Sequence, residues 1–163
     1  MSVSWADSYL GQLRAIAGDR VLLFVGARTV LRDDAGRVLL IQRSDNGHWA
    51  MPAGAMELGE SIMDCAVREV REETGLRAIG VTPFAMYTGP ERIHTNMYGH
   101  TYQVFTVAFR VNGYDGELLT STDETTDARF YRPDEFPAPL SASVTETLAD
   151  LAAFEQTGAM VLK

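Results

Sequence analysis

Cysteine is nearly absent from this sequence, which holds one cysteine, Cys65, in 163 residues. A single cysteine cannot form a disulfide within the chain, so we expect a reducing, cytoplasmic location. No apolar run reaches the roughly 18 residues of a membrane-spanning helix. Residues 1–20 scatter acidic and basic side chains and contain no apolar core, so we expect no secretory signal. These absences predict a cytoplasmic protein without a membrane partner.

Basic residues are also scarce, because 14 Lys and Arg face 22 Asp and Glu for a net charge of −8. A protein that grips a nucleic-acid backbone normally carries a basic stripe, and the sequence has none. We therefore expect no nucleic-acid polymer as partner. Acidity often serves only solubility. It is also compatible with carboxylates that bind metal cations, which then attract an anionic substrate.

The composition, with 46% hydrophobic and 22% charged residues, is that of a globular protein, and the length predicts one domain over residues 1–163. Strands outnumber helices in the pattern, which predicts an α+β fold. The expected helices are about 5–17, 61–74 and one from Ser143, which a Ser-x-x-Glu pair with Glu146 would cap. The expected strands fall within 21–44, 81–89, 97–113 and 128–132, and residues 45–54 are expected to form a loop.

Acidic side chains lie on an unexpected face of the helix 61–74. At about 100° per residue, Glu69 and Glu73 fall within about 20° of Ile62, and Glu72 lies beside Cys65. These acids share the apolar face that should be buried, whereas an ordinary amphipathic helix keeps acids in water. Burying several like charges requires cations or protons. The spacing therefore predicts a platform for Mg²⁺ or Mn²⁺, which prefer hard oxygen ligands.

A simpler alternative is a solvated helix with ion pairs between successive turns. Arg68 and Glu72 are spaced for such a pair, and acidic runs are commonly exposed. The helix pattern alone leaves both interpretations open.

The segment from Gly54 to Leu76 resembles the Nudix box, G-x5-E-x7-R-E-U-x-E-E-x-G-U with U apolar. It matches at every fixed position: Gly54, Glu60, Arg68, Glu69, Val70, Glu72, Glu73, Gly75 and Leu76. The resemblance implies a Nudix fold, an α/β/α sandwich around a mixed β-sheet, with the box as loop, helix and loop.

The resemblance also implies roles for individual residues. Glu72 and Glu73 correspond to metal ligands, and Glu69 to a ligand or general base. Glu60 resembles a further ligand, direct or through water, and Ala53 lies where the family often supplies a backbone carbonyl to the metal. Arg68 corresponds to the residue that orients a glutamate by a charge-assisted hydrogen bond.

Three residues outside the box are further candidates. In the family the general base often lies on a later loop, where this chain has Glu124; a polar surface turn is the alternative. Arg43, at a strand end, could reach a phosphate, and Trp49 could stack on a nucleobase, although solvation and core packing are the ordinary roles of such residues.

The resemblance implies a pyrophosphohydrolase that hydrolyses a nucleoside diphosphate linked to another moiety, such as ADP-ribose or a nucleotide sugar, with Mg²⁺ or Mn²⁺. A nucleoside triphosphate pyrophosphohydrolase and a dinucleoside polyphosphate hydrolase are alternatives. A nucleotide-binding module without hydrolysis is disfavoured because no box glutamate is missing. Prenyl-diphosphate isomerisation is disfavoured because Cys65 lies inside the box. The family often forms homodimers, for which Trp5 and Tyr9 of the first helix could serve, or these residues could cap the core.

Overall fold

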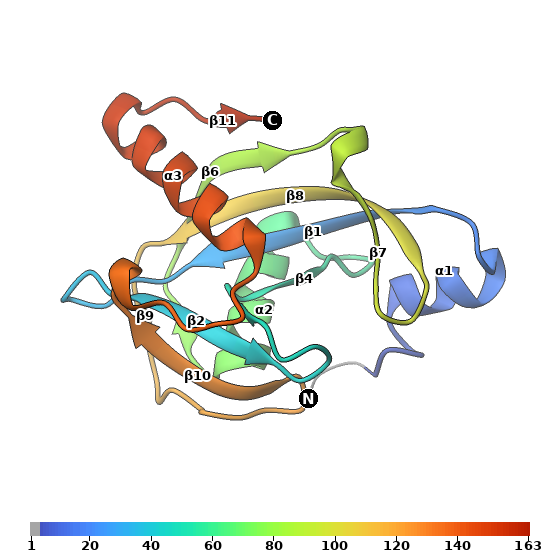
Figure 1. Cartoon of the computed structure of the whole chain (residues 1–163), viewed down its shortest axis with the longest axis horizontal. Coiled ribbons are helices and arrows are strands. Elements are labelled where there is room, and N and C mark those ends of the chain that lie inside the picture. Colours follow the sequence, from blue (N-terminus) through green and yellow to red (C-terminus); the bar gives the residue numbers. More distant parts are fainter. Residues whose placement is uncertain (1–3) are drawn as a thin grey trace.

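The computed structural model describes residues 4–163 (Figure 1). The helices are α1 (Tyr9–Ala17), α2 (Ile62–Thr74) and α3 (Ala142–Thr157), with short 3₁₀ turns η1 (Pro90–Arg92) and η2 (Pro133–Glu135). The strands are β1 (Leu22–Val30), β2 (Val38–Arg43), β3 (Trp49–Ala50), β4 (Ala53–Ala55), β5 (Arg77–Ala78), β6 (Val81–Tyr87), β7 (Ile93–Thr95), β8 (Thr101–Val111), β9 (Tyr114–Asp115), β10 (Thr125–Tyr131) and β11 (Val161–Leu162). None of the helices in this part of the chain is long and apolar enough to cross a membrane.

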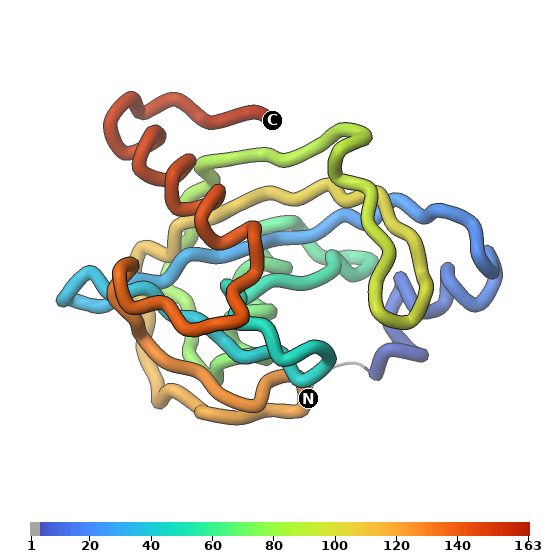
Figure 2. The backbone as a smooth tube through the Cα atoms, viewed as in Figure 1, coloured from blue at the N-terminus to red at the C-terminus, as the bar shows by residue number. Residues whose placement is uncertain are grey.

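The largest sheet is mixed and has the strand order β11-β6-β8-β1-β4, with β7 also paired to β8. Its centre is the parallel pair β1 and β8, and β4 pairs antiparallel with β1 as the outer strand. A second sheet has the order β10-β2-β3. At the end of the chain, β11 returns beside β6 in parallel, as the chain path in Figure 2 shows. The sheet thus ends, on one side, in the strand that carries the start of the Nudix-like box.

Two hydrophobic clusters divide the molecule into layers. The alternation along β2 sends Ile41 into a cluster with Val70 of α2, and its neighbour Leu40 into a cluster with Leu151 of α3. Figure 1 shows α3 in front of the strands and α2 behind them. The expected α+β class, an α/β/α sandwich around a mixed sheet, is confirmed.

The helix expected over 61–74 is confirmed as α2. Ser61 accepts a hydrogen bond from the backbone N–H of Asp64, and the Asp64 carboxylate accepts one from the N–H of Ser61, so the expected cap is present. Gly75 ends the helix with φ of 73°, a backbone conformation that glycine adopts without strain.

The other two helices depart from the expected boundaries. The first helix was expected from residue 5, but Ser8 caps the N–H of Gly11 and α1 begins at Tyr9. For α3 the expected cap is wrong. Its N-cap is Ser141, without a side-chain bond, so Ser143 lies inside the helix, and the Glu146 carboxylate pairs with Arg92.

Two short strands begin within the segment 45–54 that was expected to be a loop. β3 pairs with β2, and β4 pairs with β1. β10 begins at Thr125, earlier than the expected start at 128, since its first residues still pair with Arg43 at the end of β2. Polar and small side chains hide these pairings from a hydrophobic pattern.

Candidate active site

Helix α2 carries two of its glutamates into the interior. Glu69 is 6% exposed and Glu73 is 2% exposed, and both lie on the side of α2 that faces β1 and β4. The inward placement predicted from the spacing of these acids is confirmed. The alternative of a helix whose acids are all solvated is therefore wrong for Glu69 and Glu73. The ion pair that this alternative expected is nevertheless present, because Arg68 Nη1 lies 2.9 Å from Glu72 Oε2, one turn along α2.

The carboxylate of Glu69 lies against the backbone of β4. A Cβ atom at Gly54 would collide with all three atoms of this carboxylate. Glycine is therefore the residue that lets the Glu69 side chain approach the strand so closely. The close approach of Glu69 thus gives a direct steric reason for glycine at the first position of the box.

The guanidinium of Arg68 is the hub of the site. Its Nε and Nη2 atoms donate to both oxygens of Glu60, at 3.0 and 2.7 Å. Nη1 donates to Glu69 Oε1 at 2.6 Å and to Glu72 Oε2 at 2.9 Å. Nη2 also donates to the carbonyl of Ala55 at 2.7 Å, which ties the helix to β4. Charge-assisted bonds of this kind fix the orientation of three carboxylates at once.

Glu73 is held by the backbone of β4 rather than by Arg68. The N–H of Ala53 donates to Glu73 Oε2 at 2.8 Å. Between β1 and β4, the N–H of Thr29 donates to the carbonyl of Pro52, and the N–H of Met56 donates to the carbonyl of Val25. Hydrogen-bonded and non-hydrogen-bonded pairs alternate along such a ladder, so the pair Arg28–Ala53, next to Thr29–Pro52, is non-hydrogen-bonded. The N–H and carbonyl of Ala53 therefore point away from β1, toward the outer edge of β4 where Glu73 lies.

Burial dominates the electrostatics of the two inward acids. It raises the pKa of Glu69 to about 7, even though the charge and hydrogen bond of Arg68 act in the opposite direction. Burial, together with the negative charge of Glu69, raises the pKa of Glu73 well above its ordinary value. For Glu60 burial also acts upward, but the hydrogen bonds from Arg68 hold its pKa below the ordinary value. The site accordingly has more carboxylates than one arginine neutralises.

The donor set suits a hard divalent cation. Carboxylate oxygens of Glu69, Glu72 and Glu73 and the outward carbonyl of Ala53 are ligands that Mg²⁺ and Mn²⁺ accept. Across residues 4–163, no three acidic, histidine or cysteine side chains already converge in a metal-binding geometry. Arg68 explains this, because it draws Glu60, Glu69 and Glu72 to itself. The residues fit a cation by their chemistry and their unbalanced charge.

An open cleft of about 350 Å³ runs beside this cluster. Among its lining residues are Arg68 and Glu72 of α2 and Asp123 and Glu124 of the loop before β10. The pKa of Glu124 is raised, first by partial burial of its carboxyl and then by the charge of Glu72. The structure thus brings Glu124 to the same cleft as the box residues, and its backbone carbonyl accepts a bond from Ser44 N–H at 3.0 Å.

The two candidate substrate-binding residues lie in different environments. Arg43 is near enough to Glu73 and Glu124 to interact with their charges, but its guanidinium makes two hydrogen bonds to Asp45, at 2.9 and 2.8 Å. Trp49 is 6% exposed and packs edge-on against Tyr131 in the cluster under α3. This buried position contradicts the expected stacking role, because neither ring face is open to a nucleobase.

Residues outside the sequence prediction also belong to the site. Glu57 donates its N–H to Glu60 Oε1 at 2.7 Å, and its own carboxylate accepts the N–H of Tyr9 at 2.8 Å. No sequence signal marks this link, since Glu57 occupies a variable position of the box.

The family of the chain follows from comparison with known proteins. A model of the NUDIX domain matches residues 22–151, most of the chain. The chain belongs to the Nudix family. The expectation drawn from the box is thereby confirmed at the level of the family.

Two curated relatives illustrate the range of Nudix proteins that this chain resembles. The ADP-ribose pyrophosphatase of Methanocaldococcus jannaschii is 33% identical over 104 residues, covering 62% of this chain and 57% of the relative. The 8-oxo-dGDP phosphatase of Homo sapiens is 35% identical over 130 residues, covering 76% of this chain and 37% of the relative. The chain thus spans roughly a third to a little over half of the length of these relatives.

Solved structures agree on the Nudix fold. A UDP-X diphosphatase superposes with a TM-score of 0.67 at 20% identity, covering 94% of this chain and 73% of that chain. At this identity the likeness concerns the fold alone. Helix α1 lies before the first residue of the family match.

Proposed function

We propose that this protein is a metal-dependent pyrophosphohydrolase that hydrolyses a phosphoanhydride bond in a nucleoside diphosphate linked to another moiety. The observation that carries the proposal is the burial of Glu69 and Glu73 in one cluster, where only Glu69 is in an ion pair with an arginine. Like charges at this depth are stabilised only when a cation or a proton compensates them. A divalent cation fits the oxygen ligands, and Mg²⁺ or Mn²⁺ is the proposed ion.

Each residue of the cluster has a proposed role. Glu72, Glu73, Glu69, Glu60 and the carbonyl of Ala53 would hold the metal. When bound, such ions supply charge neutralisation at the phosphates and a lower pKa for an attacking water. Arg68 positions Glu60, Glu69 and Glu72 through its hydrogen bonds. The raised pKa of Glu124 and its place in the cleft support a role as the base that takes the proton of the attacking water. The raised pKa of Glu69 suits the same task.

The substrate class rests on the relatives. The names of two of them specify ADP-ribose and 8-oxo-dGDP, which share a nucleoside diphosphate. We propose this shared unit as the part recognised by the present chain. Nucleoside triphosphates and dinucleoside polyphosphates remain as the second candidates, because they carry the same phosphoanhydride chemistry.

The test is hydrolysis by the purified protein with Mg²⁺ and with Mn²⁺. The panel holds ADP-ribose, nucleotide sugars, nucleoside di- and triphosphates and dinucleoside polyphosphates. Glu72→Gln and Glu73→Gln are expected to lower kcat by about 100-fold or more while the fold is kept, because a neutral amide is a poor ligand for a divalent cation. Glu135→Gln, an exposed change in η2, serves as the matched control.

The products separate the candidates. AMP with ribose 5-phosphate from ADP-ribose would support the diphosphate-linked class, and pyrophosphate from a triphosphate would support the second class. Wild-type rates in both glutamine variants would contradict the metal platform. No turnover with either metal on any panel member would favour the binding-module alternative.

A further inference from the structure

The helix that precedes the Nudix region is tied to the metal platform. The backbone N–H of Tyr9, at the start of α1, donates to Glu57 Oε2 at 2.8 Å. Glu57 N–H in turn donates to Glu60 Oε1 at 2.7 Å, and Glu60 pairs with Arg68. Two hydrogen bonds and one ion pair therefore connect α1 to the centre of the cluster. A helix anchored in this way is placed to contact whatever the cluster binds.

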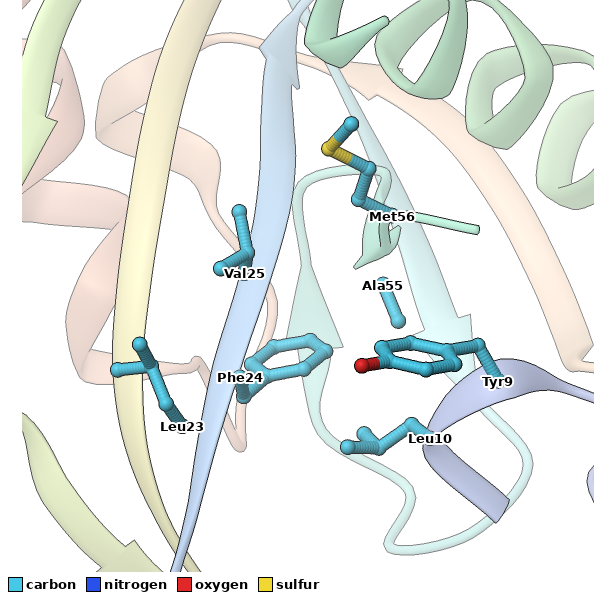
Figure 3. A pocket seen from close by; sticks show the side chains of 7 residues that line it. All are labelled: Tyr9, Leu10, Leu23, Phe24, Val25, Ala55 and Met56. Atoms are coloured by element: carbon cyan, nitrogen blue, oxygen red, sulfur yellow. The ribbon is translucent and has the colours of Figure 1, made fainter. Parts of the chain in front are cut away.

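A small hollow of about 50 Å³ lies between α1 and the edge of the sheet. Figure 3 shows Tyr9 of α1 and Phe24 of β1 pointing toward one another, with the Tyr9 hydroxyl toward the Phe24 ring and Ala55 and Met56 beside them. The Tyr9 hydroxyl makes no hydrogen bond within the described chain, and no charged side chain lines the hollow. Such a surface suits a flat, uncharged ring rather than a phosphate.

The floor of the hollow offers a free backbone donor and acceptor. Along β1, the backbone carbonyl of Val25 and the backbone N–H of Thr29 form hydrogen bonds on the β4 side. Because alternate residues of a strand point their backbone groups the same way, the N–H and carbonyl of Leu23 also point to this side. The ladder with β4 stops at Gly26–Ala55, and only Met56 N–H continues it to Val25. In the described residues, the N–H and carbonyl of Leu23 therefore have no partner beyond the end of β4. A nucleobase edge presents a matching acceptor and donor.

The hollow also lies at a fitting distance from the phosphate site. Ala55 lines it and is two residues along β4 from Ala53, about 7 Å at 3.3 Å per residue. A nucleotide whose diphosphate lies at the cluster has one ribose between that diphosphate and its base. The strand direction thus leads from the proposed metal ligands to the aromatic pair.

We propose that this hollow is the nucleobase site of the substrate, with the ring against the side chains of Tyr9 and Phe24 and its polar edge on the backbone of Leu23. The proposal rests on the proposed function for the nature of the substrate. It assigns nucleotide selection partly to α1, outside the matched Nudix region. Phosphate chemistry stays with α2 and β4, and base recognition lies with α1 and β1.

The first experiment measures binding without turnover. AMP is titrated into the full-length protein in the absence of metal, and backbone amide resonances are followed by NMR. The amide of Leu23 is expected to shift with AMP and to stay in place with ribose 5-phosphate, which lacks the base. An unmoved Leu23 amide at saturating AMP overturns the proposal.

Variants then test the aromatic wall. Tyr9→Ala is expected to weaken AMP binding about tenfold, within the range of base–aromatic stacking, whereas Tyr9→Phe keeps the ring and the affinity. Ile16→Ala changes an exposed side chain of the same helix, away from the hollow, and is the control. If Tyr9→Ala binds AMP as the wild type does while its circular dichroism is unchanged, the proposal is wrong.

Turnover separates this proposal from the one on which it rests. For a hydrolysed nucleotide, Tyr9→Ala is expected to raise KM about tenfold and to leave kcat within about twofold. A shift of the Leu23 amide without hydrolysis of any substrate would overturn the proposed function and support the base site. Hydrolysis with an unmoved amide would do the reverse.

Discussion

At the scale of single residues, Gly54 has the sharpest structural requirement in the site. The missing Cβ leaves the space that the carboxylate of Glu69 fills. Gly26 has a similar role on the facing strand, because a Cβ there would collide with the carbonyl of Gly54. Two glycines thus let α2, β4 and β1 approach one another where the buried acids lie.

Replacing Gly54 by alanine is therefore expected to damage catalysis more than folding. The new methyl group would displace the Glu69 carboxylate, and a shift of this size in a catalytic group lowers kcat by about 100-fold. The cost in stability is expected to be about 1–3 kcal/mol, as for other overpacked sites. Steady-state kinetics with Mg²⁺ and a urea titration of Gly54→Ala measure the two effects.

Gly113→Ala is the control for this variant. Its nearest neighbour would be the Ile79 Cβ at 3.9 Å, an ordinary contact, so activity within about twofold of wild type is expected. Equal kinetics in Gly54→Ala and the wild type would show that Glu69 does not need its present position.

Residue-level prediction from the sequence succeeded where spacing carries the information. The helical period places Glu69 and Glu73 on the buried face, and the structure confirms it. It failed for Trp49, because a single aromatic residue before the box has no period that separates a buried ring from an exposed one. The link from Glu57 to Tyr9 joins residues 48 positions apart, a separation over which no local pattern acts.

At the scale of elements, α2 and α3 begin in different ways. The capping pair of Ser61 and Asp64 was predictable, since both partners lie within one turn. The same reasoning failed for α3, where Glu146 accepts hydrogen bonds from Nη1 and Nη2 of Arg92 at 2.8 and 2.9 Å and lies 3.5 Å from Lys163 Nζ. Glu146 forms ion pairs with residues far away in the sequence instead of a local cap, and a local sequence pattern does not reveal such partners.

This correction predicts a stability effect that depends on pH. The hydrogen bonds from Arg92 hold the pKa of Glu146 down, to about 2, against an ordinary value of 4.5. A carboxyl group whose pKa is lower in the folded than in the unfolded state stabilises the folded protein at pH values above the unfolded pKa. This stabilisation is lost as the pH falls from 4.5 toward 2. Glu146→Gln is expected to cost about 1 kcal/mol at pH 7, with a difference from wild type that shrinks below pH 4.5.

Urea titrations of both proteins between pH 7 and pH 3 measure this difference. Glutamine serves a capping box as well as glutamate does, so a cap would predict no loss at any pH. A Glu146→Gln protein as stable as the wild type at pH 7 would therefore restore the local interpretation. The exposed Glu135→Gln again serves as the control.

The short strands mark the limit of prediction for elements. β3 and β4 hold two and three residues, and they are recognisable only through their partners β2 and β1. β4 is nevertheless the strand that supplies Ala53 and Gly54 to the site. The long elements could be predicted from period and caps, whereas the element beside the chemistry could not.

At the scale of the whole molecule, part of the acidic excess lies where it costs stability. The chain carries a net charge of −8, and two of its carboxyl groups, those of Glu69 and Glu73, are buried in one cluster where only Glu69 is in an ion pair with an arginine. Burial raises the pKa of Glu69 to about 7 and of Glu73 well above its ordinary 4.5. Between pH 4.5 and 7 the folded protein holds protons that the unfolded chain releases. The metal-free protein should therefore lose stability as pH rises through this window.

A bound divalent cation reverses this trend, because it compensates the ionised carboxylates. We expect saturating Mg²⁺ to raise Tm by about 5 °C at pH 8 and by much less at pH 5.5, where protons occupy the same oxygens. Calorimetric scans with Mg²⁺ and with EDTA at the two pH values measure this linkage without any substrate. Equal shifts at both pH values would place cation binding elsewhere than at the buried acids.

Glu73→Gln separates the two contributions. The amide oxygen can still accept the Ala53 N–H that Glu73 Oε2 accepts at 2.8 Å, but it needs neither a proton nor a metal. At pH 8 without metal, the variant is expected to be more stable than the wild type, and Mg²⁺ should hardly raise its Tm. Lower metal-free stability than the wild type at pH 8 would mean that the Glu73 charge is already compensated within the protein. The stabilising effect of the cation and its role in hydrolysis would then have separate origins.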